Sequence, residues 1–202
     1  MKKLLMIAGS SLLLSLILSC AVGPRLIDSS FIYPSIRTEG IAVLPIGGDV
    51  ADIATRKDIG LSFEKILAKK YPNIKIVGVE YTGGKLLEGN LMNDYKEVIA
   101  AYQMTEQIKS DELERIKTAI GFRYLVIPIV QNYHKEEVKD GNKYTITLES
   151  QVWDYSAKKI VFRIMTEGED SPSYLGIFDK QTLTAAAEKA IKVAVKAFPK
   201  PE

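Results

Sequence analysis

Apart from its first twenty residues, the chain is most densely apolar between Phe122 and Tyr133. The apolar residues there are mostly branched, and a single proline, Pro128, interrupts them. A short run of this kind without helical spacing is typical of a strand buried on both faces of a sheet. Because proline lacks the donor that a central strand needs, we expect a bulge or a change of strand pairing at Pro128.

Four other segments space their apolar residues as amphipathic helices do. We expect helices over residues 52–71, 91–107, 110–120 and 180–198. Alanines on the inner face of the last helix would let it pack close to a sheet. Residues 81–90 contain glycines and are expected to form a loop.

Shorter apolar or alternating segments predict the remaining strands. These cover residues 40–46, 74–78, 144–153 and 160–165. The first two flank a helix, which implies a right-handed parallel crossover. The last two follow the buried run through polar turns, as an antiparallel meander does. We therefore expect one α/β domain over residues 39–199, with a five-stranded mixed sheet flanked by helices.

The first twenty residues have the order of a secretory leader. Lys2 and Lys3 precede an apolar run that is marginal for spanning a bilayer. Its end, Ile17-Leu18-Ser19-Cys20, resembles the cleavage box of bacterial lipoproteins. The resemblance implies that residues 1–19 are removed and that Cys20 is acylated. An ordinary signal peptide or an uncleaved anchor are the alternatives.

The residue after the cysteine bears on the location of the protein. In the lipoprotein pattern, an aspartate there retains the protein in the inner membrane. Ala21 stands at that position, which implies a lipid anchor on the periplasmic face of the outer membrane. Residues 21–38 mix glycine, proline and serine with scattered apolar residues, so residues 20–38 are expected to be the acylated cysteine and a tether.

Charge disfavours nucleic acid as a partner. Without Lys2 and Lys3 in the leader, the 27 basic residues fall to 25 and equal the 25 acidic residues. Binding to nucleic acid draws its affinity from many phosphate contacts, which a neutral domain supplies poorly.

Residues suited to catalysis are few. His134 is the only histidine and is expected on a polar surface turn. Serine and cysteine nucleophiles normally need a histidine base, and zinc sites need histidine or cysteine ligands. Around Gly83, Gly84 and Lys85 the spacing departs from a phosphate loop, and Leu86 takes the hydroxyl position. We expect no enzyme, metal or cofactor; a hydrolase using surface carboxylates is the alternative.

Four aromatic residues on or beside the predicted meander are candidates for binding a partner: Tyr133, Tyr144, Trp153 and Tyr155. Aromatic side chains are enriched in the hot spots of protein interfaces. We expect Trp153 to face outward among polar residues such as Thr145, Thr147, Gln151 and Arg163. The alternative is that the last helix covers Trp153.

Four segments resemble one superfamily of envelope lipoproteins. They are Ile41–Ile46, Tyr95–Thr105, Ile116–Val126 and Val152–Val161. The superfamily includes the curli-secretion channel subunit and lipoprotein activators of penicillin-binding proteins. The resemblance covers residues 40–198 and implies the same five-stranded mixed sheet, with a meander at its end.

What the resemblance implies for function is an accessory or assembly role in an envelope complex, through binding other envelope proteins. The amphipathic hairpins of the channel subunit have no counterpart here, and the expected tether is shorter than that of the synthase activators. A secretion component in which several copies form a ring is the alternative. Whether the loops after the first two strands bind a ligand stays open at this point.

Overall fold

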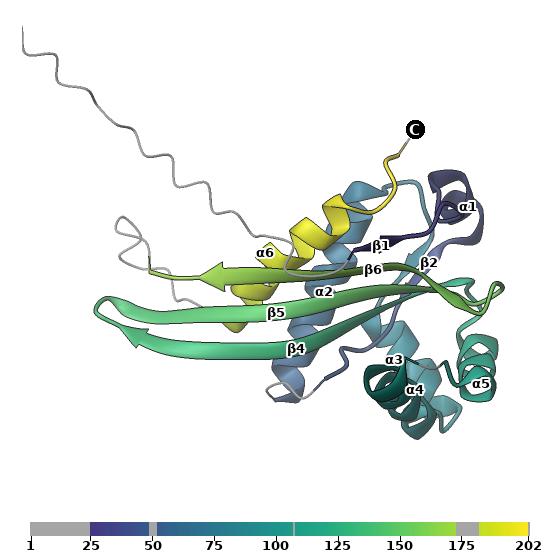
Figure 1. Ribbon diagram of the computed structural model, residues 1–202, viewed down its shortest axis with the longest axis horizontal. Coiled ribbons are helices and arrows are strands. Elements are labelled where there is room, and N and C mark those ends of the chain that lie inside the picture. The colour runs from purple at the N-terminus through teal and green to yellow at the C-terminus, as the bar shows by residue number, and fades with distance from the viewer. Residues whose placement is uncertain (1–24, 49–51, 107, 173–181, 202) are drawn as a thin grey trace, which may run out of the picture.

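The computed structural model describes residues 25–48, 52–106, 108–172 and 182–201. The strands are β1 (Leu26–Ile27), β2 (Ile41–Val43), β3 (Ile76–Val77), β4 (Tyr124–Val138), β5 (Gly141–Asp154) and β6 (Lys159–Asp170). The helices are α1 (Tyr33–Glu39), α2 (Ile53–Lys70), α3 (Val79–Glu88), α4 (Met92–Thr105), α5 (Ser110–Ile120) and α6 (Leu183–Lys196). One mixed sheet holds the strands in the order β1-β6-β5-β4-β2-β3 (Figure 1).

The predicted buried strand is β4, which lies inside the sheet. It pairs in parallel with β2 from Tyr124 to Val126 and antiparallel with β5 along its length. Beyond Val126 the pairing with β2 gives way to a single bridge between Gly47 and Ile129. The bulge or change of pairing expected at Pro128 itself is not found: Pro128 pairs with Ser150 in regular register, and its carbonyl oxygen accepts from the amide of Gly47, in the segment that follows β2, at 2.8 Å. A bulge in the pairing with β5 follows a few residues later, between Val130 and Asn132.

Helices cover both faces of the sheet (Figure 1). Helices α2 and α6 bury one core against it, and helices α3, α4 and α5 bury a second core on the other face. The alanine stripe of α6 packs very close to β6, since a Cβ built on Gly168 would lie 2.0 Å from the carbonyl oxygen of Ala186. No helix in the described part of the chain is long and apolar enough to cross a membrane.

The loop expected over residues 81–90 is wrong, because α3 occupies most of it. Val79, Thr82 and Leu86 are buried and recur at helical spacing on one side of the helix. The hydroxyl of Thr82 donates to the carbonyl oxygen of Val43 at 2.7 Å, which joins α3 to the end of β2. Two adjacent glycines in the middle of α3 lower its intrinsic helix propensity, and tertiary packing overrides that effect.

Residues 26–38 do not form the expected tether. β1 pairs antiparallel with β6 and adds a sixth strand to the five that were expected. Phe31 and Ile36 are buried, and the ring of Phe31 packs 5.6 Å from that of Phe198. The mixed α/β class is confirmed, and the segment before the first predicted strand belongs to the folded domain.

Candidate functional site

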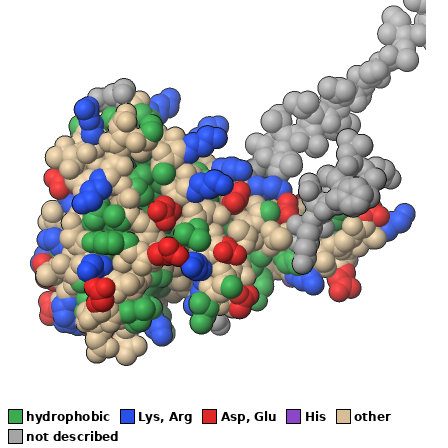
Figure 2. All heavy atoms as spheres, turned by 180° about the vertical axis from the view of Figure 1, so that it is seen from behind, with side chains coloured by type: hydrophobic (Ala, Val, Ile, Leu, Met, Phe, Trp, Pro, Cys, Tyr) green, Lys and Arg blue, Asp and Glu red, His purple; other side chains and the backbone are tan. Residues whose placement is uncertain are grey.

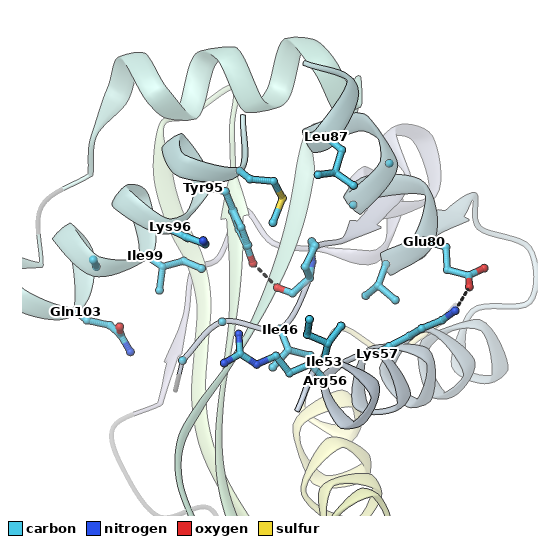
Figure 3. Close-up of a pocket in the computed structure, with 18 residues that line it drawn as sticks. Ile46, Ile53, Arg56, Lys57, Glu80, Leu87, Tyr95, Lys96, Ile99 and Gln103 are labelled. Atoms are coloured by element: carbon cyan, nitrogen blue, oxygen red, sulfur yellow. Dashed lines mark hydrogen bonds and ion pairs between the residues drawn. The ribbon is translucent and has the colours of Figure 1, made fainter. Parts of the chain in front are cut away.

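A groove lies at the carboxyl ends of the parallel strands β2 and β3. The chain leaves β2 through Pro45 and Gly47 toward α2, and it leaves β3 through Gly78 into α3. In open α/β sheets, ligands bind in the crevice outside the carboxyl ends of the strands. Here α2, α3 and α4 enclose a volume of about 910 Å³ (Figure 3). This volume is at the upper end of the ~300–1,000 Å³ that ligand sites usually occupy.

The groove is mostly apolar, and two of its apolar side chains face solvent. Ile53 at the start of α2 is 86% exposed, and Leu87 on α3 is 70% exposed. They stand on opposite sides of the groove, with Ile46 beside Ile53 and Ile99 on the side formed by α4 (Figure 3). Large apolar side chains exposed around a concave surface are characteristic of binding sites.

Tyr95 fixes the loop after β2 to α4. Its hydroxyl donates to the carbonyl oxygen of Pro45 (Figure 3). Burial raises the pKa of Tyr95 above its ordinary value, so the phenol stays neutral and remains a donor at physiological pH. The side of the groove formed by this loop is thus held by a buried hydrogen bond.

Two glycines on α3 leave its backbone bare toward the groove. A Cβ built on Gly84 meets no atom within 4 Å, and one on Gly83 meets only Pro45, at 3.7 Å. Packing explains Gly60 on α2, where a Cβ would lie 2.6 Å from Val79. A glycine inside a helix costs about 1 kcal/mol relative to alanine. Contacts within the described residues give no reason for this cost at Gly84, whereas close approach of a ligand would.

Charged side chains line the rim of the groove. Lys57 pairs with Glu80 at 2.7 Å, a contact that raises the pKa of the lysine and lowers that of the carboxyl group (Figure 3). Arg56 and Lys96 add positive charge. The carboxylate of Glu64 lies against Gly78, where α3 begins, and burial raises its pKa. This carboxyl group would disfavour a phosphate at the beginning of α3. The glycine and lysine spacing here also departs from that of a phosphate loop.

The four aromatic candidates do not form one surface. Trp153 and Tyr155 are buried, so the expected outward orientation of Trp153 is wrong. The side chain that covers Trp153 comes from α4, since its ring packs 5.5 Å from that of Tyr102. Tyr133 is exposed in the second half of β4. Tyr144 packs against the core between the sheet and helices α2 and α6, whereas Trp153 belongs to the core on the other face. Cys20 lies outside the described residues.

Two polar residues expected on the outside belong to a partly buried network instead. Glu149 is buried and accepts hydrogen bonds from Gln131, Gln151 and Arg163 at 2.5–2.8 Å. The indole of Trp153 donates to Gln151 at 2.7 Å. These hydrogen bonds give Glu149, Gln151 and the indole of Trp153 partners at the place where the end of α4 covers the sheet. Thr145 and Thr147 are half-buried on β5.

Other chemistry among the described residues is sparse. His134 is exposed on β4, opposite Thr145 of β5. No group of three or more histidine, cysteine, aspartate or glutamate residues is placed to hold a metal ion in the part of the chain that the structure describes. The residues that build the groove were missed by sequence reasoning, although the spacing of Val79, Thr82 and Leu86 could have indicated α3.

The sequence matches no protein-family model and no curated protein significantly. Among solved structures, the PelC dodecamer from Paraburkholderia phytofirmans has a TM-score of 0.50 at 10% identity, over 89% of this chain and 97% of that one. The hypothetical protein CT253 from Chlamydia trachomatis has 0.48 at 9% identity, over 78% and 94%. Lipoprotein GNA1162 from Neisseria meningitidis has 0.41 at 10% identity, over 68% and 88%. The likeness to PelC shows a shared fold.

Proposed function

We propose that this chain is an envelope lipoprotein that binds an apolar segment of another envelope protein in the groove between α2, α3 and α4. Acylated Cys20 would anchor it to the periplasmic face of the outer membrane. The observation that carries the proposal is the groove itself, with Ile53 and Leu87 exposed at its mouth and a bare glycine backbone on α3.

The shape of the groove favours a protein segment over a small molecule. Ile53 and Leu87 project into solvent, so they would bury their surface only against a partner that extends beyond the groove. Such burial contributes roughly 25 cal/mol for each Å² of apolar surface removed from water. Gly83 and Gly84 would let the partner's backbone or side chains approach α3 closely.

Site-specific photo-cross-linking in intact cells tests this proposal. A cross-linking side chain at position 87 should capture a distinct envelope protein, while the same group at exposed position 133 should not. A Cβ at Gly84 meets no atom within 4 Å, so Gly84→Phe would place an aromatic ring in the groove and should abolish the capture at position 87. Gly84→Ala is the matched control: it adds one methyl group at the same point and should weaken the capture far less than Phe does. Equal capture in the Phe and Ala variants would refute the groove as the binding site.

We propose binding rather than catalysis as the activity. In support, Glu80 is the only carboxylate among the described residues that line the groove, and it is paired with Lys57. A hydrolase acting through carboxylates is the alternative, and it would require an acid or base poised over the groove.

A second candidate function is that of a ring component built from several copies of this chain. It is favoured by the PelC structure, a dodecamer with which the chain shares its fold over 97% of that protein's length. Light scattering on the purified acylated protein in detergent would give a mass many times that of one 22.4 kDa chain if a ring forms. A monomeric mass would exclude the ring and leave the groove proposal intact.

A further inference from the structure

Three exposed apolar side chains lie close together in sequence at the beginning of the described chain. Leu26 and Ile27 on β1 are 45% and 41% exposed, and Ile32 just before α1 is 46% exposed. β1 is an edge strand, next to β6 at the end of the sheet opposite β3 (Figure 1). Apolar groups gathered at an exposed edge mark a contact with another surface.

The position of β1 relative to the rest of the domain is fixed by several contacts. Leu26 pairs with Arg163, the amide of Asp28 donates to the carbonyl oxygen of Val161 at 2.8 Å, and Lys159 binds the carboxylate of Asp28 at 2.6 Å. The buried side chain of Phe31 follows directly. Residues 26–31 are thus part of the rigid body and add nothing to the reach of an anchor.

The number of residues between Cys20 and β1 limits what can lie between β1 and the membrane. Five residues lie between Cys20 and Leu26, so the six Cα–Cα steps between the two span at most about 20 Å when fully extended. An acylated Cys20 sits at the bilayer surface, so β1 lies within that distance of the lipid headgroups. This step rests on the acylation of Cys20 in the proposed function. A folded protein partner two helices thick, about 20–24 Å, would need all of this distance or more, whereas direct contact with the bilayer needs none of it.

The charge around β1 and α1 suits an anionic surface. Arg25, Arg37, Lys158 and Lys200 are exposed there. Of the acidic residues, Asp28 is paired with Lys159 and Glu39 is exposed at the end of α1, so the basic residues remain in excess. Arg25 and Arg37 form no ion pair with any other residue that the structure describes. Figure 2 shows Lys and Arg side chains along the upper margin of the rear face. Basic residues next to an anchor are attracted to anionic headgroups over about a Debye length.

We propose that the face formed by β1 and the start of α1 rests on the lipid bilayer. Leu26, Ile27 and Ile32 would lie among the headgroups, and Arg25 and Arg37 would face anionic phosphates. A single lipid signal anchors weakly, whereas acyl chains combined with a basic, apolar surface hold a domain firmly. Because β1 and β3 form opposite edges of the sheet, this arrangement turns the groove beside β2 and β3 away from the membrane.

The proposal is tested with the purified acylated chain on vesicles of phosphatidylethanolamine and phosphatidylglycerol. A polarity-sensitive fluorophore is attached to Ile32→Cys, with Tyr133→Cys, on the far part of β4, as the matched control. On vesicles, the label at position 32 should shift its emission to the blue, and iodide should quench it several-fold less than the label at position 133. Equal quenching of the two labels would overturn the proposal.

Two further arms separate the causes of failure. Flotation with the vesicles reports the lipid anchor alone. The Cys20→Ala chain should not float. If the unaltered chain fails to float, the proposed acylation is refuted rather than the docking of the face. Arg25→Glu combined with Arg37→Glu should leave flotation intact and raise quenching at position 32 several-fold. Protection of position 32 in cells but not on lipid vesicles would also overturn the proposal and assign this face to a protein.

Discussion

Asp154 at the end of β5 forms a buried ion pair with Arg123, the residue before β4. The guanidinium donates to both carboxylate oxygens, at 2.9 and 2.7 Å, and the carboxylate has no exposed surface. Burial by itself would raise the pKa of Asp154, but the hydrogen bonds from Arg123 and from the amide of Ala157 outweigh it and lower the pKa below its ordinary value. The carboxylate is therefore more stable in the folded chain than in the unfolded one.

This shift predicts how stability depends on pH. Since the folded pKa of Asp154 lies below the unfolded value of about 3.9, the pair contributes fully above that pH and is lost as the pH falls through the folded pKa. Asp154→Asn should lower the free energy of unfolding by about 1.5–3 kcal/mol at pH 7, since Arg123 is partly exposed and screened. Urea unfolding at pH 7 and pH 3 should show this difference shrinking at the lower pH. A difference that is constant between the two would contradict the assignment.

His134 is the residue on which a catalytic role would most readily depend. Its side chain is exposed on β4, away from the groove. His134→Ala should change the free energy of unfolding by less than about 0.5 kcal/mol and leave cellular function intact. Complementation of a deletion strain is the measurement. Loss of complementation by a folded variant would support the enzyme alternative.

At the scale of single elements, α3 is the helix whose sequence and structure agree least. Its two central glycines disfavour a helix, yet Thr82 and Leu86 hold it against the end of β2 and the core. Such a conflict between local preference and fold is expected where a site requires it.

Alanine substitutions at glycines in two neighbouring helices should therefore act in opposite directions. Gly84→Ala meets no atom within 4 Å and should raise the free energy of unfolding by about 0.5–1 kcal/mol through helix propensity. Gly60→Ala places a methyl group 2.6 Å from Val79 and should destabilise the fold by about 1–3 kcal/mol. Chemical denaturation of both variants checks the pair. Destabilisation by Gly84→Ala would reveal an intramolecular role for that glycine.

At the scale of the whole molecule, the segment before β2 packs against β4, β6 and the residues that follow α6. Phe31 packs against Tyr124, Phe162 and Phe198, which come from β4, β6 and the residues after α6. The hydroxyl of Tyr71 donates to the carbonyl oxygen of Pro199 at 2.6 Å and holds the C-terminal residues to the same region.

Truncating Phe31 should consequently affect the entire domain. Phe31→Ala removes a buried ring and should cost about 3–5 kcal/mol of stability, with one cooperative transition by circular dichroism and by fluorescence. Ile32→Ala, at an exposed neighbouring position, is the control and should stay within about 0.5 kcal/mol of the original chain. A small effect of Phe31→Ala would mean that the segment contributes little to the fold.

The sequence by itself determined the elements in which the spacing of apolar residues shows which face is buried. Helices α2, α4, α5 and α6 and the strands from β2 to β6 could be predicted, because burial on one face imposes a repeat and burial on both faces gives the apolar run of β4. The tertiary structure decided what periodicity does not record. Trp153 is buried because α4 covers it, α3 is helical because β2 and the core hold it, and β1 is a strand because β6 lies beside it. The groove draws on four segments between residues 45 and 103, and only the folded chain arranges them around one volume.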